Sequence, residues 1–156
     1  MLLGGVFKAT GNQTPANIPA KGKYVFMEIE RYARQYEVAF AMNPHFPIIT
    51  LALMRGAVSY QMNGNFERYL RTCFEAIWVQ PRDMNDPGEV AAVLQANGFD
   101  AQDFTARISD PAVKEVLKAN TEEAVERGVF GAPSFFVGEQ MFFDQDRLEW
   151  AREALR

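Results

Sequence analysis

Apolar residues recur at helical spacing through the first half of the chain. Their pattern predicts helices over residues 24–36, 48–62 and 66–79, the second apolar over much of its circumference and therefore buried. The third carries the clearest stripe, formed by Phe66, Tyr69, Leu70, Cys73, Phe74, Ile77 and Trp78. Residues 1–20 are rich in Gly, Pro, Asn and Thr, which predicts an irregular loop.

Aspartates mark further helix starts in the second half of the chain. Asp86, Asp100 and Asp110 each stand where an N-cap residue is expected, and the last of these helices is predicted to stop at Arg127-Gly128. The spacing then changes to that of strands, over residues 135–137 and 141–143, with a hairpin turn between them. A final helix is predicted to open at residues 144–146.

The two predicted strands carry aromatic residues on both faces, and an isolated hairpin of this kind needs more sheet beside it. Because no other strand is predicted in the chain, we expect the strand after Pro133 to show an edge that is unpaired or covered by another chain. An open aromatic edge promotes association, so the isolated chain is expected to be marginally stable or a homodimer.

Composition limits the classes of protein that the chain can represent. Its 156 residues suffice for one domain with a core, and 48% of them are hydrophobic, which excludes a disordered chain. A net charge of −4 gives no electrostatic surface for nucleic acid. No apolar run is long enough to span a membrane, and the start lacks the features of a signal peptide. The expectation is a soluble cytoplasmic protein without membrane or nucleic-acid partners.

Histidine and cysteine, which often act in catalysis or bind metals, are scarce in the chain. His45 is the single histidine, so neither a metal site nor a Cys-His pair is proposed. Cys73 is the single cysteine and lies on an apolar stripe, which predicts a buried, unreactive thiol. The catalytic residue remains unidentified. Pro133 stands just before a strand, where it marks a turn or a strand start with either a trans or a cis peptide bond.

Several segments, taken in order, resemble one known family. They are residues 2–12 (LLGGVFKATGN), 18–22 (IPAKG), 43–47 (NPHFP), 53–55 (LMR), 76–79 (AIWV), 128–137 (GVFGAPSFFV) and 140–148 (QMFFDQDRL). The resemblance is to the DsbA-like 2-hydroxychromene-2-carboxylate isomerases and the related kappa-class glutathione transferases. It covers nearly the whole chain, and its strength lies in the combination of motifs.

The resemblance implies a thioredoxin-like (DsbA-like) α/β fold, mostly helical, in a single domain over residues 1–156. Residues 24–127 would form an all-helical insertion, and residues 128–156 the C-terminal ββα part of the thioredoxin fold. In the family a strand–helix unit precedes the segment that starts here at Leu2, with a serine that addresses the glutathione sulfur. We expect that unit to be missing, and catalysis by the short chain to be impaired for that reason.

Glutathione is the cofactor that the resemblance implies, with the Ala132–Pro133 bond cis and the Ala132 backbone gripping the cysteinyl part. Gln145 and Asp146 would hold the γ-glutamyl end, and Asn12 and Lys21 the rest of the tripeptide. Taken alone, Asp146 is a helix cap, and Asn12 and Lys21 are solvated loop residues. Asp144 departs from the glycine that is usual in the family.

His45, Arg55 and Trp78 match the family's pocket for an aromatic small-molecule substrate, although a structural role is an alternative for each. The implied reaction is addition of the glutathione thiolate to an α,β-unsaturated carbonyl, bond rotation and release of the thiolate. The alternatives are a catalytically impaired glutathione-binding fragment, a kappa-class glutathione transferase and a DsbA-type oxidoreductase. The last of these is disfavoured because paired cysteines are lacking.

Overall fold

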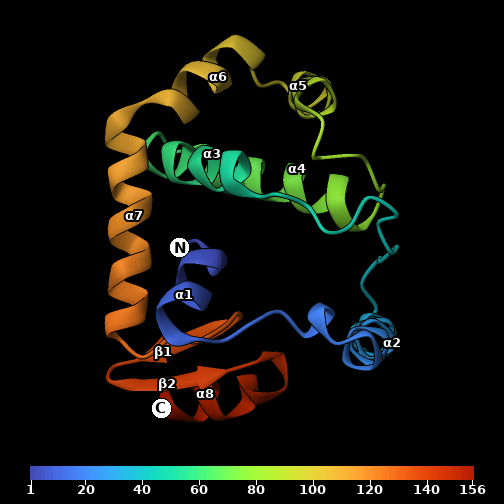
Figure 1. Cartoon of the computed structure of the whole chain (residues 1–156), viewed down its shortest axis with the longest axis vertical. Helices are drawn as coiled ribbons and strands as arrows, with labels where there is room; N and C mark the ends of the chain where they lie inside the picture. Colours follow the sequence, from blue (N-terminus) through green and yellow to red (C-terminus); the bar gives the residue numbers. More distant parts are fainter. The chain divides into compact units, whose positions relative to one another are not determined.

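The computed structural model describes residues 1–156, which form two compact units (Figure 1). Residues 1–13 and 118–156 make one unit, here called the terminal unit, and residues 14–117 make the other, here called the helical unit. The boundary falls within helix α7 (Pro111–Glu126). None of the helices has the length and apolar content of a membrane span.

The terminal unit contains a hairpin between helices. Its elements are α1 (Leu3–Thr10), the end of α7, β1 (Ser134–Val137), β2 (Gln140–Phe143), the 3-10 turn η2 (Gln145–Arg147) and α8 (Leu148–Ala154). The strands are antiparallel, with Ser134 opposite Phe143 and Val137 opposite Gln140. Gly138 has a φ of 57°, which suits glycine in a two-residue hairpin turn. Both predicted strands and the turn are confirmed.

Strand β1 pairs with β2 alone, so its other edge has no strand partner. The N–H of Asp144 donates to the carbonyl of Pro133 at 3.0 Å, which places residue 133 among those that face β2. Backbone groups alternate in direction along an antiparallel strand, so those of Ser134 and Phe136 face the free edge. The predicted unpaired edge is confirmed.

Helix α1 corrects the prediction of an irregular loop over residues 1–20; the short η1 (Pro15–Asn17) is a second departure from it. Val6 is fully buried, and the N–H of Leu2 donates to Thr121 Oγ1 at 2.8 Å. A Cβ atom on Gly5 would lie 2.9 Å from Thr121 Cγ2, so the glycine permits close packing against α7. Packing of this helix therefore outweighs the low helix propensity of its glycines.

The helical unit is built from successive helices. They are α2 (Pro19–Gln35), α3 (Leu51–Met62), α4 (Phe66–Trp78), α5 (Pro87–Ala96), α6 (Ala101–Ser109) and the first part of α7. Helix α2 starts at Pro19, earlier than the predicted Tyr24, with the proline at its first position, where its missing N–H costs nothing. The caps are as predicted: Asp86 accepts from the N–H of Gly88, and Asp100 from that of Asp103.

The core of the helical unit joins α3, α4, α5 and α6. Its buried members are Leu53, Tyr60, Tyr69, Cys73, Ala76, Ile77, Met84, Val90, Val93, Leu94, Phe99 and Phe104. The hydroxyl of Tyr69 donates to the carbonyl of Leu53 at 2.9 Å, which satisfies a polar atom inside this core. Phe74 was predicted on the apolar stripe but is 58% exposed, because the buried face of α4 follows Tyr69, Cys73 and Ala76.

Candidate functional site

The loop before β1 forms an exposed corner in the terminal unit. The Ala132–Pro133 peptide bond is cis, as predicted, and both residues are exposed. The Ser134 hydroxyl donates to the carbonyl of Gly131 at 2.9 Å. A Cβ atom on Gly131 would lie too close to the ring of Phe143, so that ring packs directly against the glycine. These contacts hold Ala132 at the start of the free edge of β1, where its backbone is accessible to an extended ligand.

Asn12 secures the same loop from the other side. Its Nδ2 donates to the carbonyl of Phe130 at 2.8 Å, and its Oδ1 accepts the N–H of Gln13 at 2.8 Å. The structure thus brings Asn12 to the loop that carries Ala132, with its amide bound to protein backbone. Its direct contact with a ligand stays a prediction.

Gln145 and Asp146 lie at the end of β2, beside the corner. The carboxylate of Asp144 accepts the N–H of Gln145 at 2.9 Å, and Asp146 forms an ion pair with Arg147. Since Asp144 also donates its N–H to Pro133, the predicted residues from 132 to 146 share one region of the terminal unit. The two carboxylates suit the ammonium of a zwitterionic group, and the polar strand edge suits its backbone amides.

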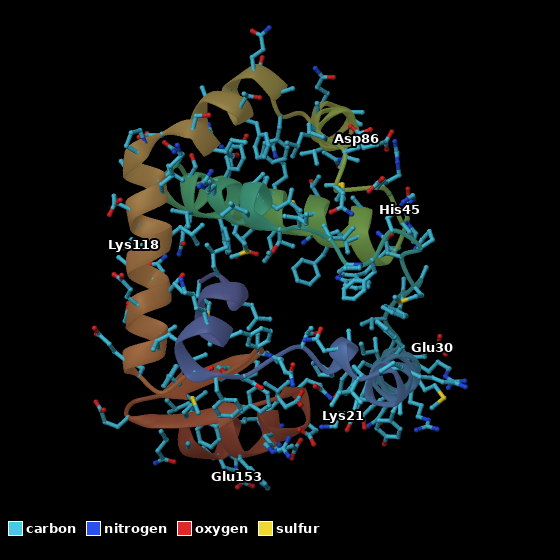
Figure 2. The ribbon with its side chains drawn as sticks, in the orientation of Figure 1. Lys21, Glu30, His45, Asp86, Lys118 and Glu153 are labelled. Carbon is cyan, nitrogen blue, oxygen red and sulfur yellow. The ribbon has the colours of Figure 1, made fainter.

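Lys21 belongs to the helical unit, at the third position of α2, and is exposed (Figure 2). An exposed ammonium on a flexible side chain is suited to a carboxylate. The residues predicted to bind glutathione are therefore divided: Lys21 lies in one unit and the other five lie in the other.

His45 lies on a loop of the helical unit that asparagines hold in place. Buried Asn43 donates through Nδ2 to the carbonyls of Ile77 and Arg82, and its Oδ1 accepts the N–H of His45 at 2.9 Å. Asn85 Nδ2 donates to the carbonyl of His45. The imidazole Nδ1 stands 3.5 Å from Asp83 Oδ2, with both side chains partly exposed. The hydrogen bonds thus fix the backbone of the loop, and the imidazole lies beside a carboxylate.

Trp78 belongs to a series of aromatic rings beside that loop. Its ring centroid is 5.8 Å from that of Phe40 and 5.9 Å from that of Phe46, and Phe46 meets Phe26 edge to face at 5.6 Å. We call these four residues the aromatic cluster. Arg55 is half-buried on α3 and makes none of these ring contacts. The structure therefore brings His45 and Trp78 together, through Phe46, while a place for Arg55 beside them stays a prediction.

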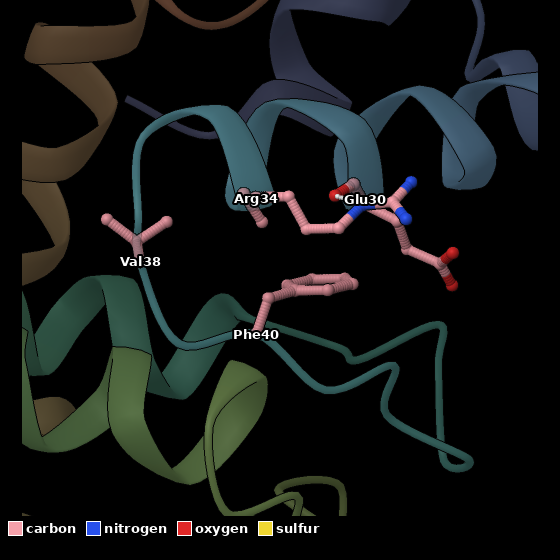
Figure 3. A pocket seen from close by; sticks show the side chains of 5 residues that line it. Glu30, Arg34, Val38 and Phe40 are labelled. Carbon is pink, nitrogen blue, oxygen red and sulfur yellow. Dashed lines mark hydrogen bonds between the residues drawn. The ribbon is translucent and has the colours of Figure 1, made fainter.

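A pocket of about 210 Å³ opens beside the aromatic cluster, within the helical unit. It is lined by Glu30, Ala33, Arg34, Val38 and Phe40. Figure 3 shows Arg34 and Glu30 extending from α2 above the ring of Phe40. Its walls offer an aromatic face together with one charge of each sign.

Cys73 is buried in the core of the helical unit, as predicted. Burial raises the pKa of its thiol to about 11, so the thiolate is scarce at neutral pH. No group of three or more His, Cys, Asp or Glu side chains is placed to hold a metal ion.

Sequence reasoning missed the residues that shape the helical unit's site. Phe26, Phe40, Asn43 and Asn85 carried no predicted role, and the Phe46–Pro47 bond is also cis. Phe26 and Phe40 resemble core residues in sequence, and a buried asparagine is indistinguishable from a loop asparagine until its partners are known. Only the unusual density of proline around His45 signalled a shaped loop.

Comparison with known proteins shows the family of the chain. The family model described as the DsbA-like thioredoxin domain matches residues 1–156. A 2-hydroxychromene-2-carboxylate isomerase from Sphingobium xenophagum is 31% identical over 153 residues, which cover 94% of this chain and 75% of that protein. Glutathione S-transferase kappa 1 from Rattus norvegicus is 29% identical over 162 residues, covering 95% of this chain and 72% of the relative.

Among solved structures, a 2-hydroxychromene-2-carboxylate isomerase superposes with a TM-score of 0.81 at 23% identity. The match covers 99% of this chain and 76% of that one, and it shows the shared fold.

The chain belongs to the DsbA-like thioredoxin family. More narrowly, it is a member of the group of enzymes formed by the 2-hydroxychromene-2-carboxylate isomerases and the kappa-class glutathione transferases. The α/β fold implied by the sequence, mostly helical with a small sheet, is confirmed.

Proposed function

We propose that the protein is a glutathione-dependent isomerase that acts on an aromatic α,β-unsaturated carbonyl compound of the 2-hydroxychromene-2-carboxylate type. The observation that carries the proposal is the exposed Ala132 backbone at the start of an unpaired strand edge. An extended peptide can add to such an edge through main-chain hydrogen bonds. The isomerases among the relatives supply the reaction class.

Glutathione fits the chemistry of the residues at the corner. Its γ-glutamyl end carries an ammonium and a carboxylate on one carbon. Asp146 and the region of Gln145 would hold these groups, and Ala132 would pair with the cysteinyl backbone. Lys21 would bind the glycyl carboxylate, and Asn12 would keep the loop before Pro133 in position through Phe130. The insertion of residues 24–127 into the thioredoxin fold is part of the same proposal.

The aromatic substrate would bind at the aromatic cluster of the helical unit, with His45 and Arg55 as its polar neighbours. Stacked and edge-to-face rings favour a flat aromatic ligand over an aliphatic one. His45, whose backbone is held by Asn43 and whose imidazole lies beside Asp83, would hold or move a proton at Nε2. Arg55 would attract the carboxylate of the substrate.

When bound, glutathione supplies a thiolate nucleophile that can add to and leave an α,β-unsaturated carbonyl. The part of this chain is to bind the tripeptide in an extended form, to orient the flat substrate and to hold protons. Cys73 cannot supply that thiolate, because it is buried and its pKa is raised. No residue of the chain is assigned as the group that activates the thiol.

The direct test is to follow isomerisation of 2-hydroxychromene-2-carboxylate by absorbance, with and without glutathione, using the 156-residue chain. The expected result is slow turnover that requires glutathione, because no residue of the chain is assigned to activate the thiol. Turnover at the same rate without glutathione would contradict the proposal. Binding of glutathione without turnover would favour the alternative of an impaired glutathione-binding protein.

A pair of lysines on α2 tests the ligand contact. Lys21→Met is expected to raise the Kd for glutathione about fivefold, because an exposed ion pair contributes up to about 1 kcal/mol. Lys23→Met is the matched control: Lys23 is exposed on the same helix, but two positions away, and so on a different face. An equal effect of both variants would remove Lys21 from the site.

We also propose that the chain is a homodimer in the cytoplasm. The free edge of β1 supports association, since Ser134 to Val137 carry no charge that would oppose pairing. A lone, buried cysteine is compatible with a reducing compartment.

A further inference from the structure

Asp144 has an unusual backbone conformation for a residue with a side chain. Its φ is 78°, and Glu37 is the only other non-glycine residue of the chain with a positive φ. With its ψ of 160°, this conformation belongs to a region that residues other than glycine rarely adopt, so it costs free energy. The N–H of Asp144 donates to Pro133, so this conformation is fixed beside the Ala132 corner.

The conformation turns the carboxylate of Asp144 back onto the chain. Its Oδ1 accepts the N–H of Gln145 at 2.9 Å, so that amide is already bound to an anion belonging to the protein itself. The neighbouring carboxylate, Asp146, is paired with Arg147. The three charged side chains of residues 144–147 leave a local net charge of −1 (two carboxylates and one guanidinium).

Capping alone does not require this charge. An asparagine at position 144 offers the same side-chain oxygen to Gln145 and bears the same backbone cost. What the aspartate adds is a negative charge at the place where the proposed ligand brings a carboxylate. A second anion there meets both repulsion and an amide that is no longer free.

We propose that Asp144 is a specificity-determining residue of the proposed thiol-binding site. Its carboxylate weakens binding of ligands that bring a carboxylate to Gln145, and it favours thiol peptides whose group at this end is uncharged or cationic. The inference rests on the proposed function, since it concerns the same site and names the class of thiol ligand that the site prefers.

The experiment compares two probes by isothermal titration calorimetry: glutathione, and its analogue in which the γ-glutamyl α-carboxylate is a carboxamide. Asp144→Asn keeps the acceptor oxygen and removes the charge. It is expected to bind glutathione about fivefold more tightly than the wild type does, a coupling of ordinary size. Its affinity for the carboxamide analogue is expected to equal that of the wild type. Glu139→Gln is the control, since it removes the same charge from the exposed hairpin turn of the same unit.

Asp144→Gly provides a second variant in which the positive φ is relaxed and the Gln145 amide is freed, and it is expected to tighten glutathione binding as well. If neither variant changes the ratio of the two dissociation constants, or if Glu139→Gln changes it equally, the specificity role is overturned while glutathione binding stands. If the wild type and both variants bind neither probe, the glutathione site fails and this inference fails with it.

Discussion

Gly56 shows how one residue sets the spacing of the core in the helical unit. A Cβ atom at this position would overlap the hydroxyl of Tyr69 and lie 2.7 Å from the ring of Phe104. Both rings are buried and belong to different helices, so neither can move without disturbing its neighbours. The glycine is therefore required by the packing of α3 against α4 and α6.

Gly56→Ala is expected to lower the free energy of unfolding by about 2–3 kcal/mol, as in other overpacked cores. Urea denaturation followed by circular dichroism measures the change. Gly4→Ala is the control, because Gly4 lies in α1 with nothing near its Cβ position, and the alanine there is expected to stabilise the helix slightly. A loss of stability in the control equal to that of Gly56→Ala would contradict the packing argument.

Cys73 gives the protein a predictable response to alkaline pH. Burial raises the pKa of the folded thiol to about 11, above the usual range of a cysteine, so the folded state holds this proton more tightly than the unfolded state. The resulting stability is complete below pH 9 and is lost as the pH rises from 9 to 11, and it amounts to about 3 kcal/mol at 1.36 kcal/mol per pKa unit.

The expected observation is that the wild type loses more stability than Cys73→Ala between pH 8 and pH 11, measured by urea denaturation. The variant keeps Tyr69, whose pKa is raised mainly by burial and which acts in the same direction, so the difference reports the thiol together with its contact to Tyr69. Identical pH profiles for the two proteins would show that the thiol is not protected from ionisation.

At the scale of elements, α1 shows where the sequence could not be interpreted correctly. Its glycines predict a loop, whereas Val6 and the hydrogen bond from Leu2 to Thr121 fix a helix. By contrast, the aspartate caps of α5 and α6 and the hairpin turn at Gly138 are local signals and were predicted correctly. Caps and turns, which depend on neighbouring residues, could be predicted from the sequence. A helix that depends on packing against a distant segment could not.

The same distinction applies to the candidate site. Pro133 and Gln145 were proposed through motifs along the chain, and the structure places both in the terminal unit, while their role in a site stays a prediction. The aromatic partners of Trp78 and the buried amide of Asn43 depend on contacts between segments far apart in sequence. No periodicity marks such residues, because their identity as site residues arises only from packing.

Val6→Ala tests the dependence of α1 on packing. It is expected to reduce the free energy of unfolding by about 2 kcal/mol and to lower the helical signal in circular dichroism, since a fully buried side chain is truncated. Leu3→Ala is the control on the same helix, because Leu3 is exposed and its truncation is expected to cost much less. Equal losses would indicate that the buried face of α1 is assigned wrongly.

At the scale of the whole molecule, the free edge of β1 is the feature that bears on self-association of the chain. The edge offers the backbone groups of Ser134 and Phe136 and contains no charged residue. Natural proteins protect such edges with charges, prolines or a covering element. Here a proline stands at the start only, which leaves the rest available to a peptide ligand or to a second copy of the chain.

Phe136→Lys is expected to shift the sedimentation coefficient from that of a dimer to that of a monomer in analytical ultracentrifugation, since a charge at the edge opposes pairing. Phe142→Lys, on β2, is the control, because it places the same charge on the strand whose partner is already β1. If the wild type sediments as a monomer at all concentrations, association through this edge is excluded.

The two tryptophans are distributed one to each unit. Trp78 is half-buried against the rings of Phe40 and Phe46 in the helical unit, whereas Trp150 on α8 is 59% exposed in the terminal unit. Indole emission shifts to longer wavelength in water, so the two residues should emit at separable wavelengths in the native protein. Trp78→Phe and Trp150→Phe would each leave one unit with its own intrinsic fluorophore, so that the melting of either unit can be recorded without any label.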